Sequence, residues 1–560
     1  MKNFLLITCF CVPFIFKAQN PLFIPTSIEG NSINLTLAES SYEFYGGTIT
    51  NTMGANGDVL APTIIMNQGQ NVDITVNNQL MDTTTIHWHG LHVSPANDGG
   101  PHNEILPGGQ WNPQFTVLDK AGTYWYHPHL HMKTDLHVSK GIAGMLLVRD
   151  AEEASLNLPT TYGVDEFPLI MQTKGFDANN QILVHTDLDN IPMVNATVNA
   201  VLDVPAQVVR LRLLNGASQR VMEVGFSDDR TFELIGTDGG LLTAPVSLTR
   251  YRMAPGQRAD ILVDLSGQEN TNFYLMSFAS ELPSAIYGAT QPGMGPGSTS
   301  SLPDYTSNIL NGNDFSLMKF MVVGQTANPI TTIPSSLANI EILQESSANT
   351  TRTLTFSSSG AMGNLAGPFL INGQGFNMDV INYEVPLNNT EIWSLNNQTA
   401  IAHPFHIHDV QFQILDINGA APPPALQGWN DMVLVPGGMG NVRFIAQFTD
   451  HADNDIPYMY HCHMLTHEDM GMMGQFKVID PTGALNTPNE ELTWSVFHDS
   501  QQNTVTIKTY EPMNYEIIGV DGHSIWQGHV DFNKTIFLKS SSTIIIVRDG
   551  YGNAEKLLLN

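Results

Sequence analysis

The chain has 560 residues and a formal net charge of −30, although only 14% of its residues are charged. A chain of this length can bury the cores of three or four domains. The excess of acidic side chains argues against nucleic acid or an anionic membrane surface as a partner, whereas metal cations and neutral or cationic organic molecules would be tolerated, and the charge mainly indicates solubility.

The first 19 residues have the pattern of a secretory signal peptide. Lys2 gives a positive start, a short apolar run extends from Phe4 to Phe16, and the polar segment Ala18-Gln19-Asn20 follows. The run is too short to span a bilayer. We therefore expect an exported protein that is periplasmic, attached to the cell surface or secreted.

The cysteine content agrees with export and points to a metal. Cleavage of the leader would remove Cys9 and Cys11, so the mature chain would keep only Cys462. A single thiol cannot form an intrachain disulfide, even in an oxidising compartment. An exported thiol without a disulfide partner is itself an argument for metal ligation.

Short β-rich segments recur between Gly, Pro and Asn turns, and helical patterning is scarce. This pattern is typical of β-sandwiches or barrels. The predicted strands are Thr63–Met66, Val72–Val76, Tyr124–His127, Val208–Leu214, Ile261–Val263, Ile392–Leu395, Met459–His461 and Phe476–Ile479. The Gly-, Pro- and Ser-rich stretch Pro283–Ser301 is expected to be a mobile loop.

Histidine is concentrated in a few motifs. Random placement of the 19 His would give about 0.6 His-x-His pairs, whereas the sequence contains five. In chain order the motifs are His87-Trp88-His89, His127-Pro128-His129, His403-Pro404-Phe405-His406-Ile407-His408, His461-Cys462-His463, and His467 with Met472 beyond it.

These residue types fit copper better than zinc. Imidazole suits several transition metals, but one Cys with two His and a weak, distant Met is the set found in blue-copper electron-transfer sites. A structural zinc site would use four close ligands, usually with more Cys.

Strand geometry suggests how one motif could serve two metal centres. Alternate side chains of an extended strand point to opposite faces. In an extended His461-Cys462-His463, both His face one way and Cys462 faces the other. His406 and His408 share a face, and His403 has the opposite parity and can turn toward Cys462. Electrons would then have a covalent path from a thiolate-bound copper to a histidine-bound cluster.

At this point the chain resembles the multicopper oxidases over roughly residues 30 to 480. The stretches that carry the resemblance are HWHGLHVSPANDGGP, GTYWYHPHLHMKTDLHVSKGIAGMLLV, HPFHIHDVQFQIL and HCHMLTHEDMGMM. It is most similar to three-domain bacterial laccases and to the periplasmic cuprous oxidase of copper homeostasis. The resemblance implies an all-β fold of three cupredoxin-like Greek-key β-sandwich or barrel domains, at about 30–150, 160–325 and 335–480.

The resemblance also implies four copper ions with a complete set of ligands. The type 1 copper would be held by His403, Cys462 and His467, with Met472 as the weak axial ligand. The type 2 copper would be held by His87 and His406. The pair of type 3 coppers would be held by His89, His127, His129, His408, His461 and His463.

Two acids are candidates for supplying protons, because reduction of dioxygen to water consumes them. Asp98 lies in the turn after the first His pair, and Glu468 directly follows His467. The alternatives are that Asp98 is a turn residue and that Glu468 only orients a ligand. The other His are expected to be structural or surface residues: His92, His102, His131, His137, His185, His451, His498, His523 and His529.

Residues 490–560 are expected to form a separate small β-domain. Their order of short strands and the ending Lys556-Leu557-Leu558-Leu559-Asn560 resemble the C-terminal sorting domain of type IX secretion. This resemblance implies secretion machinery as a partner. The alternative is an ordinary C-terminal β-domain.

The sequence predicts a laccase-like enzyme that couples one-electron oxidation of phenolic or other aromatic donors to four-electron reduction of dioxygen to water. Two alternatives are a cuprous or ferrous ion oxidase and a non-catalytic copper-binding protein. The segment from Phe356 to Ile371 has only Met362 and no room for the Met-rich helix of the cuprous oxidases. The approach Thr399–Ala402 to His403 has no acid or Met, so organic donors are favoured.

Overall fold

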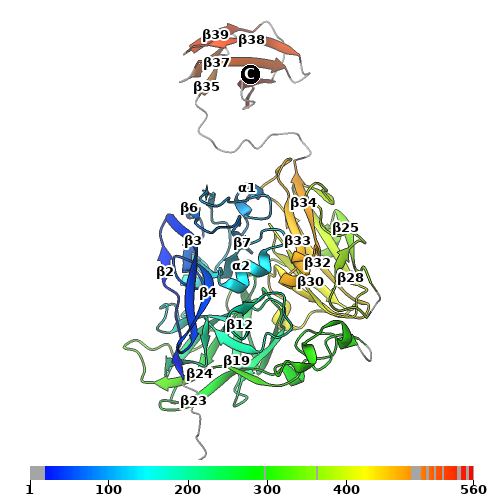
Figure 1. Cartoon of the computed structure of the whole chain (residues 1–560). Coiled ribbons are helices and arrows are strands. Elements are labelled where there is room, and N and C mark those ends of the chain that lie inside the picture. Colours follow the sequence, from blue (N-terminus) through cyan, green and yellow to red (C-terminus); the bar gives the residue numbers. More distant parts are fainter. Residues whose placement is uncertain are drawn as a thin grey trace, which may run out of the picture. The chain divides into compact units, whose positions relative to one another are not determined.

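A computed structural model describes residues 19–294, 298–360 and 363–480, together with the strands of the C-terminal region and a few neighbouring residues (Figure 1). The predicted signal peptide lies outside the described residues, apart from Gln19. The chain divides into two compact units, Met1–Ile479 and Asp480–Asn560. In the described part of the chain, no helix is long and apolar enough to cross a membrane.

Two five-stranded sheets form the first sandwich of the larger unit, and their facing residues, among them Ile33, Leu35 and Trp88, make a buried core. One sheet has the order β2 (Ser27–Glu29), β5 (Thr63–Asn67), β11 (Gly144–Arg149), β10 (Gly122–His127) and β7 (His87–His89). The other has the order β4 (Thr48–Ala55), β3 (Ser32–Tyr45), β6 (Asn71–Asn78) and β8 (Gln110–Trp111), with β9 (Gln114–Thr116) also paired to β6.

The middle of the chain forms a second pair of sheets around its own core. The larger sheet has the order β15 (Thr197–Val198), β14 (Ile191–Val194), β12 (Glu166–Phe176), β17 (Val208–Asn215), β22 (Arg258–Asp264), β19 (Phe232–Thr237) and β20 (Gly240–Leu248), with β13 (Ile182–Leu183) on β12. The other has the order β1 (Asn20–Pro21), β16 (Ala200–Pro205), β24 (Phe315–Val323), β23 (Asn272–Ser277), β18 (Met222–Phe226) and β21 (Arg250–Met253).

A third pair of five-stranded sheets follows, with a core that includes Trp393, Phe405 and Phe476. One sheet has the order β26 (Phe369–Ile371), β25 (Thr350–Ser358), β28 (Asn389–Asn397), β32 (Gly440–Phe448) and β30 (Phe412–Ile417). The other has the order β27 (Tyr383–Pro386), β34 (Met473–Ile479), β33 (Tyr458–Cys462), β29 (His403–Ile407) and β31 (Met432–Val435).

Helices are few and short among the described residues. The α-helices are α1 (Pro95–Asp98), α2 (Thr134–Lys140), α3 (Ala151–Ala154) and α4 (Leu465–Asp469). The 3-10 helices are η1 (Ala279–Glu281), η2 (Ser298–Ser301), η3 (Tyr305–Ser307), η4 (Glu345–Ser347) and η5 (Pro424–Leu426). From Pro283 to Met294, the predicted loop contains no helix or strand. Residues 295–297 lie outside the described part of the chain, and the last residues of the predicted loop form η2.

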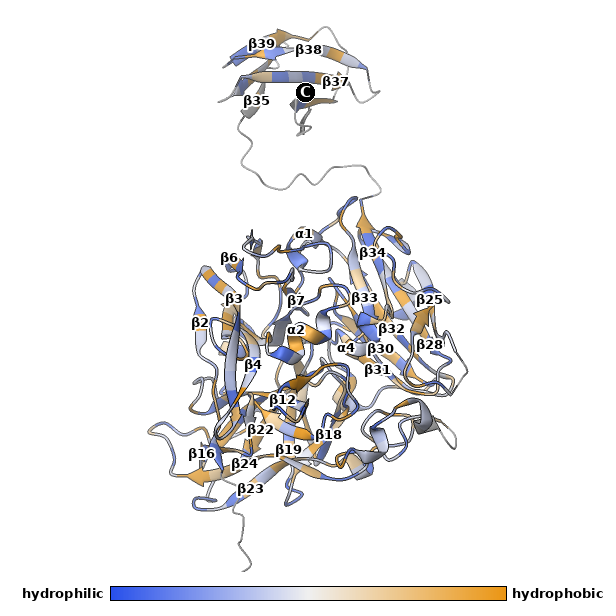
Figure 2. Cartoon of the chain, in the orientation of Figure 1, coloured by the Kyte–Doolittle hydropathy of each residue, from blue (hydrophilic) through white to orange (hydrophobic). Residues whose placement is uncertain are grey.

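The predicted all-β fold is confirmed, and each of the eight predicted strands lies within an observed strand. Residues on β3 alternate between exposed and buried from Ser32 to Leu37, because one face packs on the core and the other meets solvent. Strand β12 is buried on both faces over nearly its whole length. Figure 2 shows hydrophobic and hydrophilic residues along the strands of the larger unit.

The smaller unit is a two-sheet β-structure with its own core, which includes Val505, Ile517 and Val547. One sheet has the order β35 (Trp494–Asp499), β36 (Thr504–Thr509) and β39 (Asn533–Phe537). The other has the order β38 (Ser524–Val530), β37 (Met513–Gly519), β40 (Ile544–Asp549) and β41 (Ala554–Leu558). A small C-terminal β-domain was predicted, and its sorting role stays a prediction.

Candidate metal centre

The thiol of Cys462, at the end of β33, lies between two imidazoles. Its Sγ is 3.5 Å from His403 Nδ1 on β29 and 3.6 Å from His467 Nδ1 on α4. The Thr399 hydroxyl donates to Asn397 Oδ1 at 2.8 Å, so its oxygen can accept a proton from His403 Nε2, also at 2.8 Å. His403 Nδ1 is then a bare lone pair directed at the sulfur.

The backbone of Met472 and the ring of Phe369 lie beside this group. Met472 is fully buried, and its carbonyl accepts the Cys462 amide hydrogen at 3.0 Å. The ring of Phe369 on β26 lies 4.7 Å from the ring of His403 and 4.5 Å from that of His467, measured between centroids. His403, Cys462 and His467 therefore come together in a buried group, and the backbone of Met472 lies next to it.

The other eight predicted ligands form a second buried cluster between the first and third sandwiches. Their candidate ligand atoms lie within 4.8 Å of one another in each of three groups. The groups are His87 with His89 and His406; His89 with His127 and His463; and His129 with His408 and His461.

Strand alternation explains this sorting. His461 belongs to one group of three and His463 to another, and their ring centroids are 5.4 Å apart. Cys462 between them belongs to the separate thiol group. Because His403 differs in parity from His406, it joins Cys462 rather than the histidine cluster, as the sequence predicted.

The tautomers that the hydrogen bonds require leave lone pairs facing one another. His127 Nδ1 lies 2.8 Å from the Pro128 carbonyl, which can only accept, so Nδ1 carries the proton and Nε2 is bare. By the same argument the Nε2 atoms of His87 and His406 are bare, and both are buried without a hydrogen-bond partner. His461 Nε2, 3.1 Å from His129 Nε2, is also bare. Lone pairs this close repel one another unless a cation lies between them. The donor atoms of these residues therefore suit a metal cluster.

Burial keeps these side chains in the protonation states that suit a metal. It lowers the pKa of His89, His127 and His403 well below the usual value, and that of His461 to about 3. The imidazoles are therefore neutral bases at neutral pH. Burial also raises the pKa of the Cys462 thiol, so a bound cation is needed to hold the thiolate.

Comparison with known proteins identifies the family. Three multicopper oxidase family models match the chain, at residues 36–153, 143–291 and 341–482. The chain belongs to the multicopper oxidase family. It is 31% identical over 479 residues to the multicopper oxidase mco of Staphylococcus haemolyticus, which covers 82% of this chain and 93% of the relative.

Two further relatives mark the range of this family. The cell division protein FtsP of Photorhabdus laumondii is 30% identical over 469 residues, covering 82% of this chain and 93% of the relative. The solved structure of the laccase-like oxidase CueO from Ochrobactrum sp., described with activity towards lignin model compounds, is 31% identical with a TM-score of 0.72; it covers 82% of this chain and all of that one. The smaller C-terminal unit lies almost wholly beyond the matched family models.

Asp98 of this multicopper oxidase lies against two cluster histidines. Its Oδ2 accepts from His408 Nδ1 at 2.8 Å, its Oδ1 is 3.4 Å from His87 Nδ1, and its carbonyl accepts from the same nitrogen at 2.9 Å. The next residue, Gly99, has φ 81°, and a Cβ there would lie 1.7 Å from the Ile86 carbonyl oxygen. Only glycine permits the turn that places Asp98 here.

Glu468 lies against two other histidines of the oxidase cluster. Its Oε1 is 3.4 Å from His129 Nδ1 and accepts the Thr134 hydroxyl at 2.6 Å, and its Oε2 is 3.1 Å from His461 Nδ1. Burial raises the pKa of this carboxyl group, and His129 opposes the shift. Thr134, on α2, was not among the predicted site residues.

Asp431, just before β31, is a site residue that the sequence did not reveal. Its Oδ1 lies 3.2 Å from His89 Nε2, and its carbonyl accepts from His406 Nδ1 at 2.9 Å. Both carboxylate oxygens also accept from Arg258 of β22, in the middle sandwich. An acid before a buried strand gives no sequence signal that it will meet a histidine 342 residues away.

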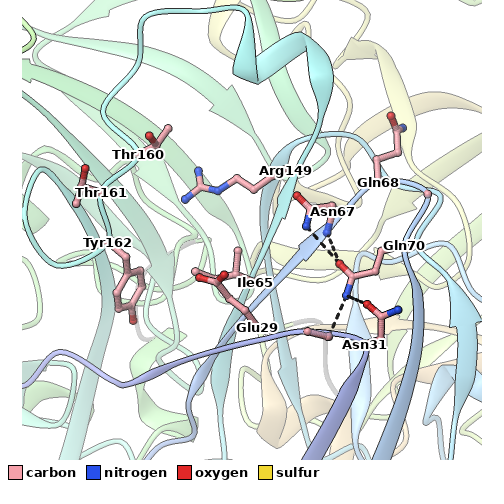
Figure 3. Close-up of a pocket in the computed structure, with 12 residues that line it drawn as sticks. Glu29, Asn31, Ile65, Asn67, Gln68, Gln70, Arg149, Thr160, Thr161 and Tyr162 are labelled. Carbon is pink, nitrogen blue, oxygen red and sulfur yellow. Dashed lines mark hydrogen bonds between the residues drawn. The ribbon is translucent and has the colours of Figure 1, made fainter.

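The hollow in Figure 3 is a separate feature of the oxidase surface. It has a volume of about 790 Å³ and is lined by polar residues such as Asn67, Gln68 and Gln70. Gln70 is already bonded to Asn67 and Asn31, and Arg149 is paired with Glu166. None of its lining residues is a His or Cys, so it carries none of the metal chemistry.

Proposed function

We propose that this multicopper oxidase is laccase-like and binds four copper ions. It oxidises phenolic or other aromatic donors at the Cys462 group and reduces dioxygen at the histidine cluster. The proposed ligands are the twelve residues predicted from the sequence. When bound, the copper ions supply the one-electron oxidation of the donor and the four-electron reduction of dioxygen to water.

A cavity beside the Cys462 group is the observation that carries the organic-donor proposal. It has a volume of about 570 Å³, and its wall includes Ala402, the residue before His403. Most of its lining is apolar, with Leu248, Ile286 and Leu426 among the contributors. A cavity of this size, with few polar groups, suits an aromatic molecule rather than a hydrated metal ion.

The neighbourhood of His403 supports the same donor class. Thr399 occupies the hydrogen-bonding position on His403 Nε2, and its hydroxyl carries no charge. The described residues between β25 and β26 form no helix, as predicted for the short segment around Met362, which itself lies outside them. Thr399 offers neither a carboxylate nor a thioether to a cuprous or ferrous ion, and Met362 is the one thioether in the sequence from Phe356 to Ile371.

The chain's own acids serve the proton demand of the reaction. Asp98 Oδ2 holds the Nδ1 hydrogen of His408, and Glu468 lies against the Nδ1 atoms of His129 and His461. In this proposal, each carboxylate orients those imidazoles and passes protons to the cluster. Asp431 orients His89 and His406 in the same way and is anchored by Arg258.

The first experiment tests the metal assignment. Cys462→Ser should abolish the intense blue colour and donor oxidation in copper-loaded protein. Copper analysis should give four ions per chain in the native protein. Full occupancy by zinc in copper-replete protein, with no blue band, would refute the assignment.

The second experiment tests the donor class. Ser284→Trp, at an exposed lining position of the cavity, should raise KM for a bulky phenol about tenfold, while the KM for ferrous ion stays unchanged. Ser280→Trp, on the nearby η1 and outside the cavity lining, is the matched control. Phenol turnover that requires added copper ions would instead favour the cuprous oxidase.

We also propose that the oxidase is exported, with secretion machinery as the partner of its tail. The leader-like residues 1–19 and the β-structured C-terminal unit support this. Fractionation of the native host, with and without residues after Asp480, tests it. Loss of the tail should change the location and leave oxidase activity intact.

A further inference from the structure

The cavity that includes Ala402 has only positive charges among its described lining residues. Two arginines of β21, Arg250 and Arg252, contribute these charges, and no acid is part of the described lining. The rest of the wall is largely apolar, with Val433 and Leu434 of β31 among its residues. A ligand that fits this cavity has an apolar body and can place a negative group at one end.

Each guanidinium nitrogen of Arg250 already has a partner within the protein. Its Nη2 donates to Asp229 at 2.6 Å, its Nη1 donates to the Thr249 carbonyl at 2.8 Å, and its Nε donates to Glu281 at 3.2 Å. The guanidinium also lies over the ring of Phe278, 3.3 Å from its centroid. Arg250 is therefore a structural part of the cavity wall.

Arg252 differs from Arg250 because only its Nε has a described partner. This nitrogen donates to Glu223 Oε2 at 2.7 Å, and the two residues lie directly opposite each other on β21 and β18. No described contact occupies the terminal nitrogens Nη1 and Nη2, and 39% of the side chain is exposed. These two nitrogens form a planar edge of the kind that binds a carboxylate through two parallel hydrogen bonds.

Gln257 supplies a neutral donor to the same cavity. Its side chain is buried in the wall, and its Oε1 accepts the Ala254 amide hydrogen at 2.8 Å. That bond fixes which end of the amide is the acceptor, so Nε2, which has no described partner, is a donor. An oxygen atom on the body of the ligand would satisfy it.

The acids of the protein do not cancel this cationic end. Glu223 lies outside the cavity lining, and burial raises the pKa of its carboxyl group while Arg252 opposes the shift. The net charge of −30 repels anions at long range, but this repulsion is screened beyond about 8 Å at physiological ionic strength. Recognition of an anion therefore depends on local hydrogen bonds, and the free edge of Arg252 supplies two.

We propose that this cavity binds phenolic carboxylates, with the carboxylate held by the terminal nitrogens of Arg252 and the aromatic ring against the apolar wall. The inference rests on the proposed oxidase function, which makes this cavity the donor site. The carboxylate is unchanged in the reaction. Four phenols each lose one electron and the hydroxyl proton, and one dioxygen takes up the four electrons and four protons as two water molecules. Arg252 thus determines specificity and takes no part in electron transfer.

The test compares 4-hydroxycinnamate with its methyl ester, which has the same ring and no charge, as donors for copper-loaded full-length protein. Arg252→Gln should raise KM for the acid about tenfold or more relative to KM for the ester, with little change in kcat, because it removes hydrogen bonds to a charged group. Glu223→Gln should instead lower KM for the acid, because Arg252 then has no competing carboxylate. Arg230→Gln is the matched control: this arginine also pairs with an acid, Asp228, but lies outside the cavity lining.

A binding titration without turnover separates this inference from the proposed function. The probe is 4-methoxybenzoate, which has no phenolic hydrogen, and Arg252→Gln should weaken its binding about tenfold or more. If neither phenol is oxidised but this difference in binding is found, the oxidase proposal fails and the carboxylate site stands. The inference is overturned if Arg252→Gln, folded with a native Tm, changes KM equally for acid and ester or binds 4-methoxybenzoate as tightly as the native protein.

Discussion

Asp431→Asn removes a carboxylate charge that contacts both a buried arginine and a histidine of the candidate metal cluster. The carboxylate is buried, pairs with both terminal nitrogens of Arg258 and lies 3.2 Å from His89 Nε2. The substitution keeps the shape and the main-chain carbonyl that accepts from His406. It therefore separates the effect of the carboxylate charge from that of packing.

The cost in stability follows from the Arg258 pair. Breaking a buried ion pair by removing one partner costs about 3–5 kcal/mol. Asp238 Oδ1 lies 3.5 Å from Arg258 Nη1, and burial, opposed by Arg258, raises the pKa of Asp238 to about 8. The charge of Asp431 contributes to this raised pKa, so its removal favours ionisation of Asp238 beside Arg258. We expect a loss at the low end of the range, about 3 kcal/mol.

Asp431→Asn should also lower the affinity for copper, and by more than we would expect if the carboxylate only stabilised the fold. Loss of a carboxylate that orients a metal-bound His typically lowers metal affinity 10–100-fold, and we expect at least about tenfold here. Denaturant unfolding measures the stability, and copper retention against a graded chelator measures the affinity. The blue colour of the Cys462 group serves as an internal reference, since Asp431 does not touch that group in the described contacts.

Asp260→Asn is the matched control. Asp260 is also buried, accepts from Arg210 at 2.7 Å and from Arg212 at 2.9 Å, and has no described contact with a predicted ligand. It should lower stability by a similar amount and leave copper retention at the native level. Equal copper retention in the two variants would refute the reasoning that Asp431 positions His89.

Three further predictions concern single features. Asp98→Asn should lower kcat about tenfold to a hundredfold, with the blue spectrum intact, because the carboxylate contacts the cluster histidine His408 and not the thiol group; unchanged turnover across pH would leave Asp98 as a turn residue. Met472→Leu should raise the reduction potential of the blue site without loss of copper, since a thioether is a weak axial donor; an unchanged potential in redox titration would exclude Met472 as the ligand. A chain ending at Asp480 should fold and keep its oxidase activity and Tm, because the larger unit ends at Ile479; an inactive or unfolded product would contradict this.

Much of the site could be predicted because its information is local. In His461-Cys462-His463, alternation along one strand sends the thiol and the imidazoles to different groups, and this requires only that the segment be extended. The same argument separates His403 from His406, which lie in two different groups of candidate ligands. The copper ions themselves and the boundaries of the three predicted sandwich domains stay predictions.

The histidines outside the motifs show the limit of such arguments. His92 and His451 were expected to be structural or surface residues, because neither has a partner at a recognisable spacing. The fold brings His92 beside Asp409 and Asp450, which follow two different strands of the third sandwich, with its ring centroid 5.5 Å from that of His451. Nothing in the spacing of these residues predicts that meeting.

The sequence by itself determined the all-β class, the family and the set of candidate metal ligands, since each depends on residue types at short, fixed spacings. Only the tertiary structure decided what surrounds them. Asp431 reaches His89 across 342 positions and Arg258 across 173, and the cavity lined by Ala402 is walled by the middle and third sandwiches together. Such contacts arise when distant strands pack to bury their apolar faces, and that packing is a property of the whole chain rather than of any one motif.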